Sequence, residues 1–565
     1  MMANCSDSTS KCFPTGKVAV SAAGVIGVIC AYVFAPSEAA ASLVRYGAYW
    51  PVFIAFVGLI AYLFRLFRAE TVRVGNICNQ LGWVYLVFLI ACVTTCFVHA
   101  EFGPKVLMDD AILASTAKSL HQTREVFTPT FGRWIANDFV CFDGYVDKRP
   151  LLYPFAVSLL HDVSGYRAAN PYILNVACGV ALLVGVGLLG FALAGKRGGY
   201  LLPLLWVSIP LLSQNATGSG MDLINLVLLV AVILLSILYL ERLDSWSEGA
   251  LALAGVLLAQ GRYESPLFLL PIAIVILLGW YRKQRVILSY GTVFAAPLLI
   301  GLVLQNKFFS QSESLWELHS GTQNPFSLSN IPGNAAGALT FLFNTGDGFA
   351  NSLLVAVLAS VASVFLLLYS IRELKRMSSI DGTQLVVALF SFFIFTHVIV
   401  VFSYHDGRLD RLFASRFALP FYLLLTVIVV IALDICSKSV KIWSCACVGS
   451  IVFIVGFTLP MNAKAVFTRR NYVTNEINWL QSLADRRFES RSLVVDMYTI
   501  PWTTRQTASI SPLQAFGNAL RLDDDLKGGK YGAIYIVERC DYMSDEGNLR
   551  LSDSTFPAGV FALDL

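Results

Sequence analysis

The sequence predicts an all-α, polytopic membrane protein with about 13 transmembrane helices, followed by a small α/β domain outside the membrane. Of its 565 residues, 56% are hydrophobic and only 14% are charged, whereas ordinary globular domains carry about 25% charged residues. Apolar stretches recur from Val18 to Leu459, and most are long enough to cross a hydrocarbon core of about 30 Å. From residue 461 the composition becomes that of a soluble domain.

The expected spans follow from the apolar stretches in order. They are 18–35, 47–66, 81–99, 172–194, 200–213, 221–240, 249–260, 266–281, 286–304, 350–371, 383–402, 417–435 and 443–460. The few cations fall largely in the short loops between these spans, where they set topology. The net charge of +4 therefore indicates no particular partner, and we expect no nucleic acid to bind.

One further apolar segment, LLYPFAVSLL at 151–160, is not counted as a span. It is too short to cross and contains Pro154, so we expect a helix lying along the membrane surface. Counting it would move every later basic loop to the wrong side. With a cytoplasmic N-terminus, the loops 100–171 and 305–349 and the C-terminal tail then all face outward.

The tail shows the patterns of a small α/β domain. NEINWLQSLADRR (475–487) is amphipathic and predicts a helix, while SLVVDM (492–497) and YGAIYIV (531–537) predict strands. FALDL (561–565) is a candidate last strand.

Charged residues gather at the expected outer edge of the spans. Charges near a bilayer centre cost about 2.5–3.5 kcal/mol each on insertion scales, so those that are retained tend to be functional or paired. The polar residues at this level come from distant parts of the sequence: Asp109, Asp110, Lys148, Arg149, His161, Asp222, Arg262, Glu264, His405, Asp406, Arg408, Asp410, Arg411 and Arg416. This pattern suits a site at the membrane–water boundary, with carboxylates for proton transfer and cations for an anion.

The acidic residues also have a purely structural interpretation. Carboxylates at a helix N-terminus are stabilising by about 0.3–1 kcal/mol, which would account for Asp109 and Asp110. Asp222 would cap the span that follows it. His397, inside an apolar span, is interpreted as a core histidine.

The basic residues have such an interpretation too. Lys148 and Arg149 would be snorkelling anchors, and Arg262 with Glu264 a local ion pair. The structural interpretation is weaker where positive charge in a short outer loop runs against the positive-inside trend, as it does for Arg408, Arg411 and Arg416.

Five segments, taken in order, resemble the GT-C glycosyltransferases. They are MDDAILASTAKSL, DKRPLLYPFAVSLLHDVSGY, SGMDLINL, AQGRYESPLFLLP and RFALPFYLLL. In the same order, the family shows an acidic pair at the start of a juxtamembrane helix and a Lys-Pro-Pro-Leu-Tyr-Pro motif before a surface helix. These are followed by an Asp at the outer end of a span, a Thr-Arg/Lys segment and an Arg-x-x-x-Pro motif at the start of a late span. The likeness covers roughly residues 80–435. It is strongest to the branch of protein O-mannosyltransferases and lipid A aminoarabinose transferases.

The sequence departs from the family pattern at three points. Asp110 stands where Glu is common, Arg149 replaces the first proline after Lys148, and two extra spans precede the matching part. The resemblance thus implies three regions: extra helices at 1–80, a GT-C transmembrane catalytic domain at 81–460 whose outer loop 100–171 carries juxtamembrane helices, and an extracytoplasmic α/β domain at 461–565.

The resemblance implies an inverting transfer of a sugar from a polyprenyl-phosphate donor. Asp109 matches the family's general base, and Asp110 is expected to raise its basicity or orient it. Lys148 is the first choice for the leaving phosphate by motif, and the other candidates by position are Arg149, Arg262, Arg408, Arg411 and Arg416. Further pocket residues are Asp222, Glu264, Tyr153 and His405. An apolar groove between short spans would hold the lipid tail.

The partners expected from this resemblance are a lipid-linked sugar donor and a cell-envelope glycan or lipid acceptor, as in polysaccharide or lipopolysaccharide biosynthesis. The expected location is a bacterial inner membrane, with the active site on its periplasmic side. A protein acceptor is the alternative within the class. A lipid or sugar transporter is the alternative outside it, disfavoured because no two halves match and the charges gather at one face. No cofactor is required, although paired acids or His405 with Asp406 leave a divalent metal open.

Overall fold

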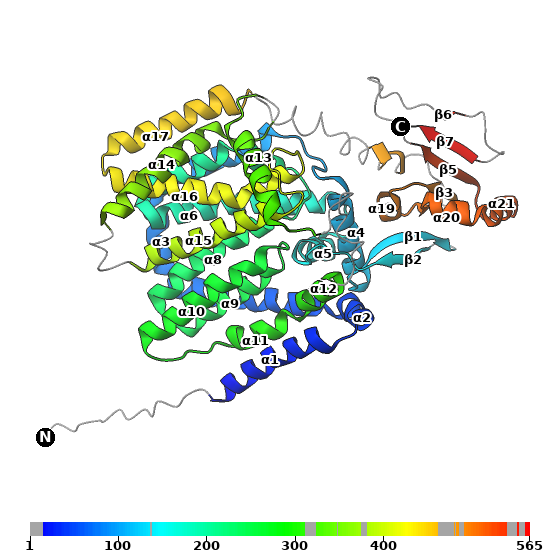
Figure 1. The fold of residues 1–565 in the computed structure, drawn as a ribbon, viewed down its shortest axis with the longest axis horizontal. Coiled ribbons are helices and arrows are strands. Elements are labelled where there is room, and N and C mark those ends of the chain that lie inside the picture. Colours follow the sequence, from blue (N-terminus) through cyan, green and yellow to red (C-terminus); the bar gives the residue numbers. More distant parts are fainter. Residues whose placement is uncertain are drawn as a thin grey trace.

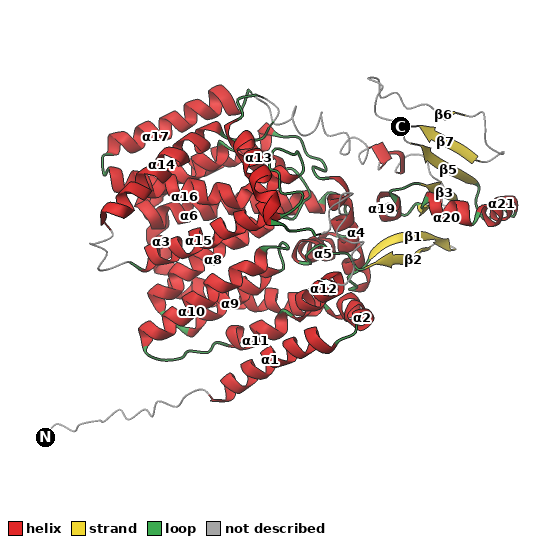
Figure 2. Cartoon of the chain, in the orientation of Figure 1, coloured by secondary structure: helices red, strands yellow, loops and turns green. Residues whose placement is uncertain are grey.

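The computed structural model describes residues 15–135, 138–310, 324–346, 349–373, 381–460 and 491–538, with short pieces at 479–480, 482–484, 551–552 and 560–564. Long helices form one block, and all strands lie beyond one end of it (Figures 1 and 2). The prediction of a predominantly helical polytopic membrane chain is confirmed.

Ten helical segments of the described residues are long and apolar enough to cross a membrane. They are Thr15–Phe34, Tyr49–Ala69, Asn170–Val207, Asp222–Arg242, Ser265–Lys283, Tyr290–Ser310, Leu353–Arg372, Gly382–Ser403, Ala414–Cys436 and Val440–Thr458, with shorter apolar helices at Gly82–Val98 and Ser245–Ala259. Large apolar side chains such as Val361, Leu367 and Phe392 are more than half exposed on these helices, as expected of surfaces that face lipid. The count of about 13 crossings stays a prediction.

Helix α6 (Asn170–Val207) covers the predicted span 172–194 and the first part of the predicted span 200–213, and it is broken in the middle. Ala194 and Gly195 leave helical geometry, and Gly195 has a φ of 60°, a left-handed value that glycine adopts without strain. A Cβ on Gly190 would lie 2.2 Å from the carbonyl oxygen of Gly198. Gly190 and Gly198 therefore let the segments on either side of the break pack in close contact.

Two short helices, α4 (Leu107–Thr123) and α5 (Leu152–Ser164), lie between the block and the strands (Figure 1). The helix expected at 151–160 is present as α5, whose 13 residues extend about 20 Å, less than the hydrocarbon thickness. Leu113 and Ala117 of α4 pack with Tyr153 and Val157 of α5. This apolar contact fixes the orientation of α4.

The remaining helical elements complete the block. In chain order they are α1 (Thr15–Phe34), α2 (Ser37–Gly47), α3 (Tyr49–His99), α7 (Pro210–Ala216), α8 (Asp222–Arg242), α9 (Ser245–Ala259), η1 (Ser265–Phe268), α10 (Leu269–Lys283), α11 (Tyr290–Leu298), α12 (Ile300–Ser310), η3 (Leu328–Asn330), α13 (Ile331–Phe343), α14 (Leu353–Glu373), α15 (Gly382–Ser403), η4 (Ala414–Phe417), α16 (Ala418–Cys436), α17 (Val440–Phe453) and η5 (Ile454–Thr458). Helix α13 lies within the predicted loop 305–349, where the sequence analysis expects no helix.

The described part of the tail contains a five-stranded sheet in the order β4-β3-β5-β7-β6. Its strands are β3 (Ser492–Val495), β4 (Ala508–Ile510), β5 (Ala533–Glu538), β6 (Leu551–Ser552) and β7 (Val560–Asp564), with helices α19 (Thr499–Thr504), α20 (Pro512–Gly517) and α21 (Ala519–Lys527). Strands β3, β5 and β7 lie within or beside the three predicted strand segments. Most of the helix predicted at 475–487 lies outside the described residues.

The tail sits directly against the membrane-side elements. An antiparallel hairpin of β1 (Thr128–Ile135) and β2 (Asp138–Tyr145), which the sequence analysis does not predict, lies beside it. Lys118 Nζ on α4 donates to the carbonyl oxygen of Thr504 at 2.7 Å. Trp134 Nε1 on β1 donates to the carbonyl oxygen of Gln506 at 2.8 Å. Residues 499–506 are therefore held over α4.

Candidate functional site

The first turn of α4 presents Asp109 and Asp110 in two directions. Successive residues of an α-helix are about 100° apart around its axis, so adjacent side chains meet different neighbours. Asp109 turns toward basic residues from other segments, and Asp110 turns toward a cavity under the tail.

Two arginines bind Asp109. Arg149 donates to Asp109 Oδ1 from Nε at 2.8 Å and from Nη2 at 2.5 Å, and Arg416 Nη2 donates to Asp109 Oδ2. Both guanidinium groups are less than a tenth exposed, so these charge-assisted bonds are poorly screened. Burial opposes ionisation, but the two arginines outweigh it and hold the pKa of Asp109 well below its usual value.

The ionic contacts continue from Arg416 toward the bundle interior. Arg416 Nη1 lies 3.6 Å from Asp222 Oδ2, and Arg262 Nη1 pairs with Asp222 Oδ1. Arg262 Nε donates to Glu264 Oε1 at 2.9 Å, and His397 Nε2 lies 3.4 Å from the same oxygen. At the other end, Arg149 Nη1 donates to Asp147 Oδ1 at 2.7 Å. We call this set, from Asp147 to His397, the ionic network.

Two buried amides hold the loops that carry the network. Gln305 Nε2 on α12 donates to the carbonyl oxygens of Asp147 and Arg149, at 2.9 and 3.0 Å. Asn175 Nδ2 on α6 donates to the carbonyl oxygens of Gly218 and Gly220, at 2.9 and 3.0 Å, just before Asp222. Both loops are thus fixed by their backbone, which pre-organises the side chains that they present.

Arg416 has donors that the protein does not use. Its side chain is 8% exposed, yet Nε and Nη1 donate no hydrogen bond to any described residue. A buried polar group left without a partner costs about 1–3 kcal/mol, and more when it is charged. Nε and Nη1 of this arginine are therefore left for a further hydrogen-bond acceptor.

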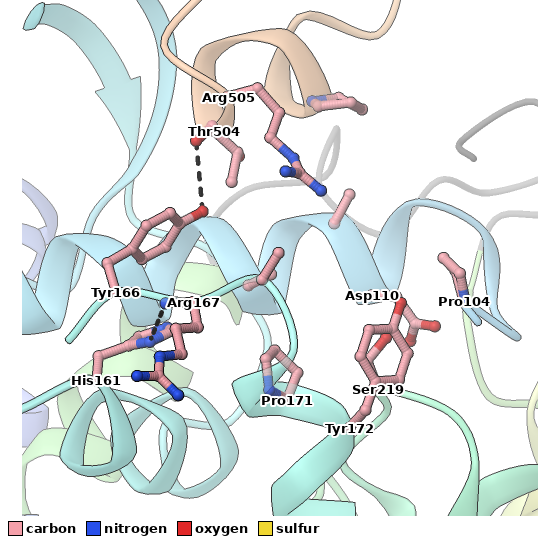
Figure 3. Close-up of a pocket in the computed structure, with 14 residues that line it drawn as sticks. Pro104, Asp110, His161, Tyr166, Arg167, Pro171, Tyr172, Ser219, Thr504 and Arg505 are labelled. Atoms are coloured by element: carbon pink, nitrogen blue, oxygen red, sulfur yellow. Dashed lines mark hydrogen bonds between the residues drawn. The ribbon is translucent and has the colours of Figure 1, made fainter. Parts of the chain in front are cut away.

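Asp110 has a different environment. It is 3% exposed, and its Oδ2 accepts from the backbone N–H of Lys105 at 2.8 Å and of Val106 at 3.5 Å. Its Oδ1 accepts no hydrogen bond from the described residues. Burial raises the pKa of Asp110 to about 6, although the Lys105 N–H opposes this rise. Figure 3 shows the carboxylate pointing from α4 toward Tyr172 and Ser219.

The structure brings together six of the residues selected from the sequence and separates others from them. Asp109, Arg149, Asp222, Arg262, Glu264 and Arg416 are all members of the ionic network. Arg408 instead pairs with Asp410 at 2.6 Å and Arg411 with Asp406 at 2.5 Å, and both arginines are more than 40% exposed. These two arginines lie outside the network.

The other selected residues include Tyr153, His405 and Lys148. Tyr153 is fully buried and donates to the carbonyl oxygen of Pro171 at 3.1 Å, so it packs behind α4. His405 Nδ1 lies 3.6 Å from Asp406. Lys148 lies close enough to the buried Asp147 to lower the pKa of that carboxyl group, which burial raises overall.

Sequence reasoning did not select Lys105 or Asp147, and it interpreted His397 only as a core histidine. Lys105 is 4% exposed, and burial lowers its pKa to about 8. Buried Asp147, at 6%, is two residues before Arg149, a spacing that predicts a turn contact. A signal for His397 was its position in an apolar span, where ionisable residues are functional candidates.

The charged side chains of the network are arranged as ion pairs. Among the described residues, no three His, Cys, Asp or Glu side chains gather closely enough to hold a metal ion. The carboxylates of the network are paired with arginines instead. The arrangement thus combines clustered guanidinium groups with an adjacent carboxylate of raised pKa.

No protein-family profile and no curated protein matches the chain. Among solved structures, the chain is similar to ArnT from Cupriavidus metallidurans bound to undecaprenyl phosphate, at 12% identity over 78% of this chain and 89% of that chain, with a TM-score of 0.48. It is also similar to the oligosaccharyltransferase of Archaeoglobus fulgidus tethered with an acceptor peptide, at 11% identity over 77% of this chain and 65% of that chain, with a TM-score of 0.45. Both are GT-C glycosyltransferases, the superfamily that the sequence motifs resemble. At these scores the likeness carries no information on donor, acceptor or residue roles.

Proposed function

We propose that the protein is an integral membrane inverting glycosyltransferase that moves a sugar from a polyprenyl-phosphate donor to a cell-envelope glycan or lipid on the outer face of the membrane. The proposal rests above all on Arg416. This buried arginine has two unused donors and lies at the end of a lipid-exposed helical block. A lipid-linked phosphate has both the charge and the apolar tail that such a place requires.

The leaving group explains why several cations are gathered. When the bond from the anomeric carbon to the phosphate oxygen breaks, negative charge builds on the phosphate, and fixed positive charges stabilise it. Arg416 and Arg149 supply that charge from either side of Asp109. In this scheme Asp109 positions the two guanidinium groups, because a carboxylate that accepts three bonds from arginines is a weak base.

Arg262 and Asp222 form the inner wall. The Arg262 guanidinium lies 4.8 Å from the ring centre of Phe417, a cation–π contact that holds it beside Arg416. Because Arg262 is also bound by Glu264 and Asp222, it is better suited to orienting Asp222 and Arg416 than to reaching a ligand.

The test compares two arginines from the same loop. Purified protein in detergent is supplied with polyprenyl-phosphate-linked sugars and a cell-envelope glycan fraction, and released polyprenyl phosphate and transferred sugar are measured. We expect Arg416→Gln to lower kcat about 10²–10³-fold, the usual loss when one donor to a developing anion is removed. It should also abolish the rise in thermal stability that undecaprenyl phosphate causes in the wild type.

Arg408→Gln is the matched control. Arg408 is exposed and pairs within its own loop, so its loss should leave kcat and ligand-induced stabilisation unchanged. If the two substitutions had equal effects, Arg416 would contribute only through its positive charge and not through hydrogen bonds to the phosphate. Absence of sugar transfer and of polyprenyl phosphate release in the wild type, with every donor tried, would contradict the proposed function itself.

A further inference from the structure

A cavity lies between α4, the N-terminal end of α6 and the tail. The volume that the centre of a water molecule can occupy inside it is about 80 Å³. A cavity needs roughly 10–15 Å³ of such space to hold one water, so this one has room for several waters. Small residues, among them Ala111, Ala114 and Ala168, line it beside the hydroxyl groups of Tyr172 and Ser219. Hydroxyl groups on a small-residue wall suit a polar ring.

Asp110 lies on the wall of this cavity, where the Ser219 side chain also interacts with its carboxylate. Oδ2 is fixed by two backbone N–H groups, which hold the carboxylate in one orientation. Oδ1 is buried and has no hydrogen-bond partner among the described residues. A buried acceptor without a donor is costly, and an acceptor hydroxyl placed in the cavity would satisfy it.

The rim of the cavity is basic. Arg167 comes from the α5–α6 connection and Arg505 from the tail, and both line the cavity. Figure 3 shows Arg505 extending from the tail toward α4. Asp110 is the only carboxylate among the lining residues that the structure describes. A ligand that bears negative charge beside its reacting hydroxyl group would complement these cations.

We propose that this cavity is the acceptor subsite. Asp110, rather than Asp109, takes the proton from the acceptor hydroxyl group. The acceptor is an acidic sugar that bears a carboxylate or phosphate group. This inference rests on the proposed function and refines it. The tail, through α19 and Arg505, then forms one wall of the subsite and contributes to acceptor selection.

The step balances as a single displacement. The acceptor oxygen forms a bond to the anomeric carbon while the bond from that carbon to the donor phosphate oxygen breaks. The hydroxyl proton passes to Asp110 Oδ1, and the electron pair leaves with the polyprenyl phosphate near Arg416. Gly220 lies between the two places: a Cβ on it would be 3.6 Å from Asp110 Oδ1 and 3.3 Å from Asp222 Oδ2. Because Gly220 has no side chain, carboxylate oxygens of Asp110 and Asp222 both lie close beside its backbone.

The first experiment replaces each acid separately. Asp110→Asn should lower kcat about 10²–10⁴-fold, the usual contribution of a general base, while undecaprenyl phosphate still raises thermal stability. Asp110→Glu should restore part of the activity. Asp109→Asn should instead weaken stabilisation by undecaprenyl phosphate, because it frees Arg149 and Arg416 from their fixed positions.

The pH profile gives an independent readout. The carboxylate must be ionised to accept a proton, so kcat/KM should fall as pH drops below about 6 and be level above it. The charged and titratable groups near Asp110 include Asp109, Lys105, Arg416, Tyr153 and Tyr172. Across the cavity they include His161, Arg167 and Arg505. In Asp110→Glu, the pH at which kcat/KM falls on the acidic side should shift. If that pH were unchanged in this variant, the fall would have to be assigned to another titratable group.

The second experiment tests acceptor charge with defined probes. Methyl glucuronoside should inhibit transfer more strongly than methyl glucoside, by roughly two- to fivefold, the size of a partly exposed ion pair. Arg505→Gln should remove that difference, while undecaprenyl phosphate should raise the thermal stability of this variant as much as that of the wild type.

Each failure has its own meaning. Full activity in Asp110→Asn overturns the base assignment while sugar transfer by the wild type leaves the proposed function standing. Equal inhibition by the two glycosides overturns the acidic acceptor. A wild type that binds no polyprenyl phosphate and transfers no sugar removes the proposed function, and this inference with it.

Discussion

The two ends of α9 place buried charged groups in opposite circumstances. At its start, Glu248 is fully buried and accepts from three uncharged donors: Ser289 N at 3.0 Å, Thr292 Oγ1 at 2.6 Å and Trp280 Nε1 at 3.0 Å. Just beyond its end, Arg262 joins a network in which Arg416 keeps two buried donors unused.

The difference separates structural from functional burial of charge. A buried polar group that is fully hydrogen-bonded adds rigidity and has no capacity left for a ligand. A buried group with unused donors makes the ligand-free protein less stable. Such a group is tolerated where a bound ligand accepts hydrogen bonds from those donors and so restores the lost stability. Glu248 belongs to the first kind and Arg416 to the second.

The largest effect that would test this comparison is expected at Arg262. Arg262→Gln takes from buried Asp222 the nearer of its two arginines and leaves only Arg416 Nη1 at 3.6 Å, and breaking one member of a buried pair costs about 3–5 kcal/mol. We expect a large loss of thermal stability together with loss of sugar transfer, measured by thermal unfolding in detergent and by the transfer assay.

The double variant Asp222→Asn with Arg262→Gln supplies the control. It removes both charges of this pair, so part of the stability should return while activity remains low; Glu264, which Arg262 also binds, still loses its arginine. If the single and double variants unfold at the same temperature, the pair contributes no coupling and the network is not the source of stability at this end.

A smaller effect, on stability alone, is expected at Glu248. Glu248→Gln places an amide N–H₂ group against one of the three donors, which should cost about 1–3 kcal/mol. Because Glu248 is at the far end of α9 from Arg262, kcat should be unchanged. A fall in kcat larger than about threefold, in protein that remains folded, would contradict the division between the two ends.

The sequence was sufficient to locate the network but not to divide its roles. Asp109, Asp222, Arg262 and Arg416 could be selected because charge is scarce in an apolar chain and each stands at the same end of a span. Their motif order indicated the class of chemistry. The helical block could be predicted for the same reason, since hydropathy reports local composition.

What the sequence could not supply depends on orientation and on distant contacts. Whether Asp109 or Asp110 faces the arginines follows from how α4 is rotated, which its packing on α5 determines. Arg408 and Arg416 occupy one loop, yet only Arg416 lies in the buried turn η4 while Arg408 pairs locally. The cavity needs the tail folded over α4, a contact between residues nearly 400 positions apart, such as Lys118 and Thr504.

The smallest predicted effect probes the boundary between the cavity and the network. Gly220→Ala adds a methyl group 3.3 Å from Asp222 Oδ2 and 3.6 Å from Asp110 Oδ1, a fit that requires a shift of only a few tenths of an ångström. We expect little change in thermal stability and in binding of undecaprenyl phosphate, with kcat reduced by about tenfold or less, because small displacements of reacting groups slow transfer. Gly333→Ala is the matched control, since a Cβ there meets nothing within 4 Å. If Gly220→Ala transferred sugar as fast as Gly333→Ala, the reacting groups would not meet beside Gly220.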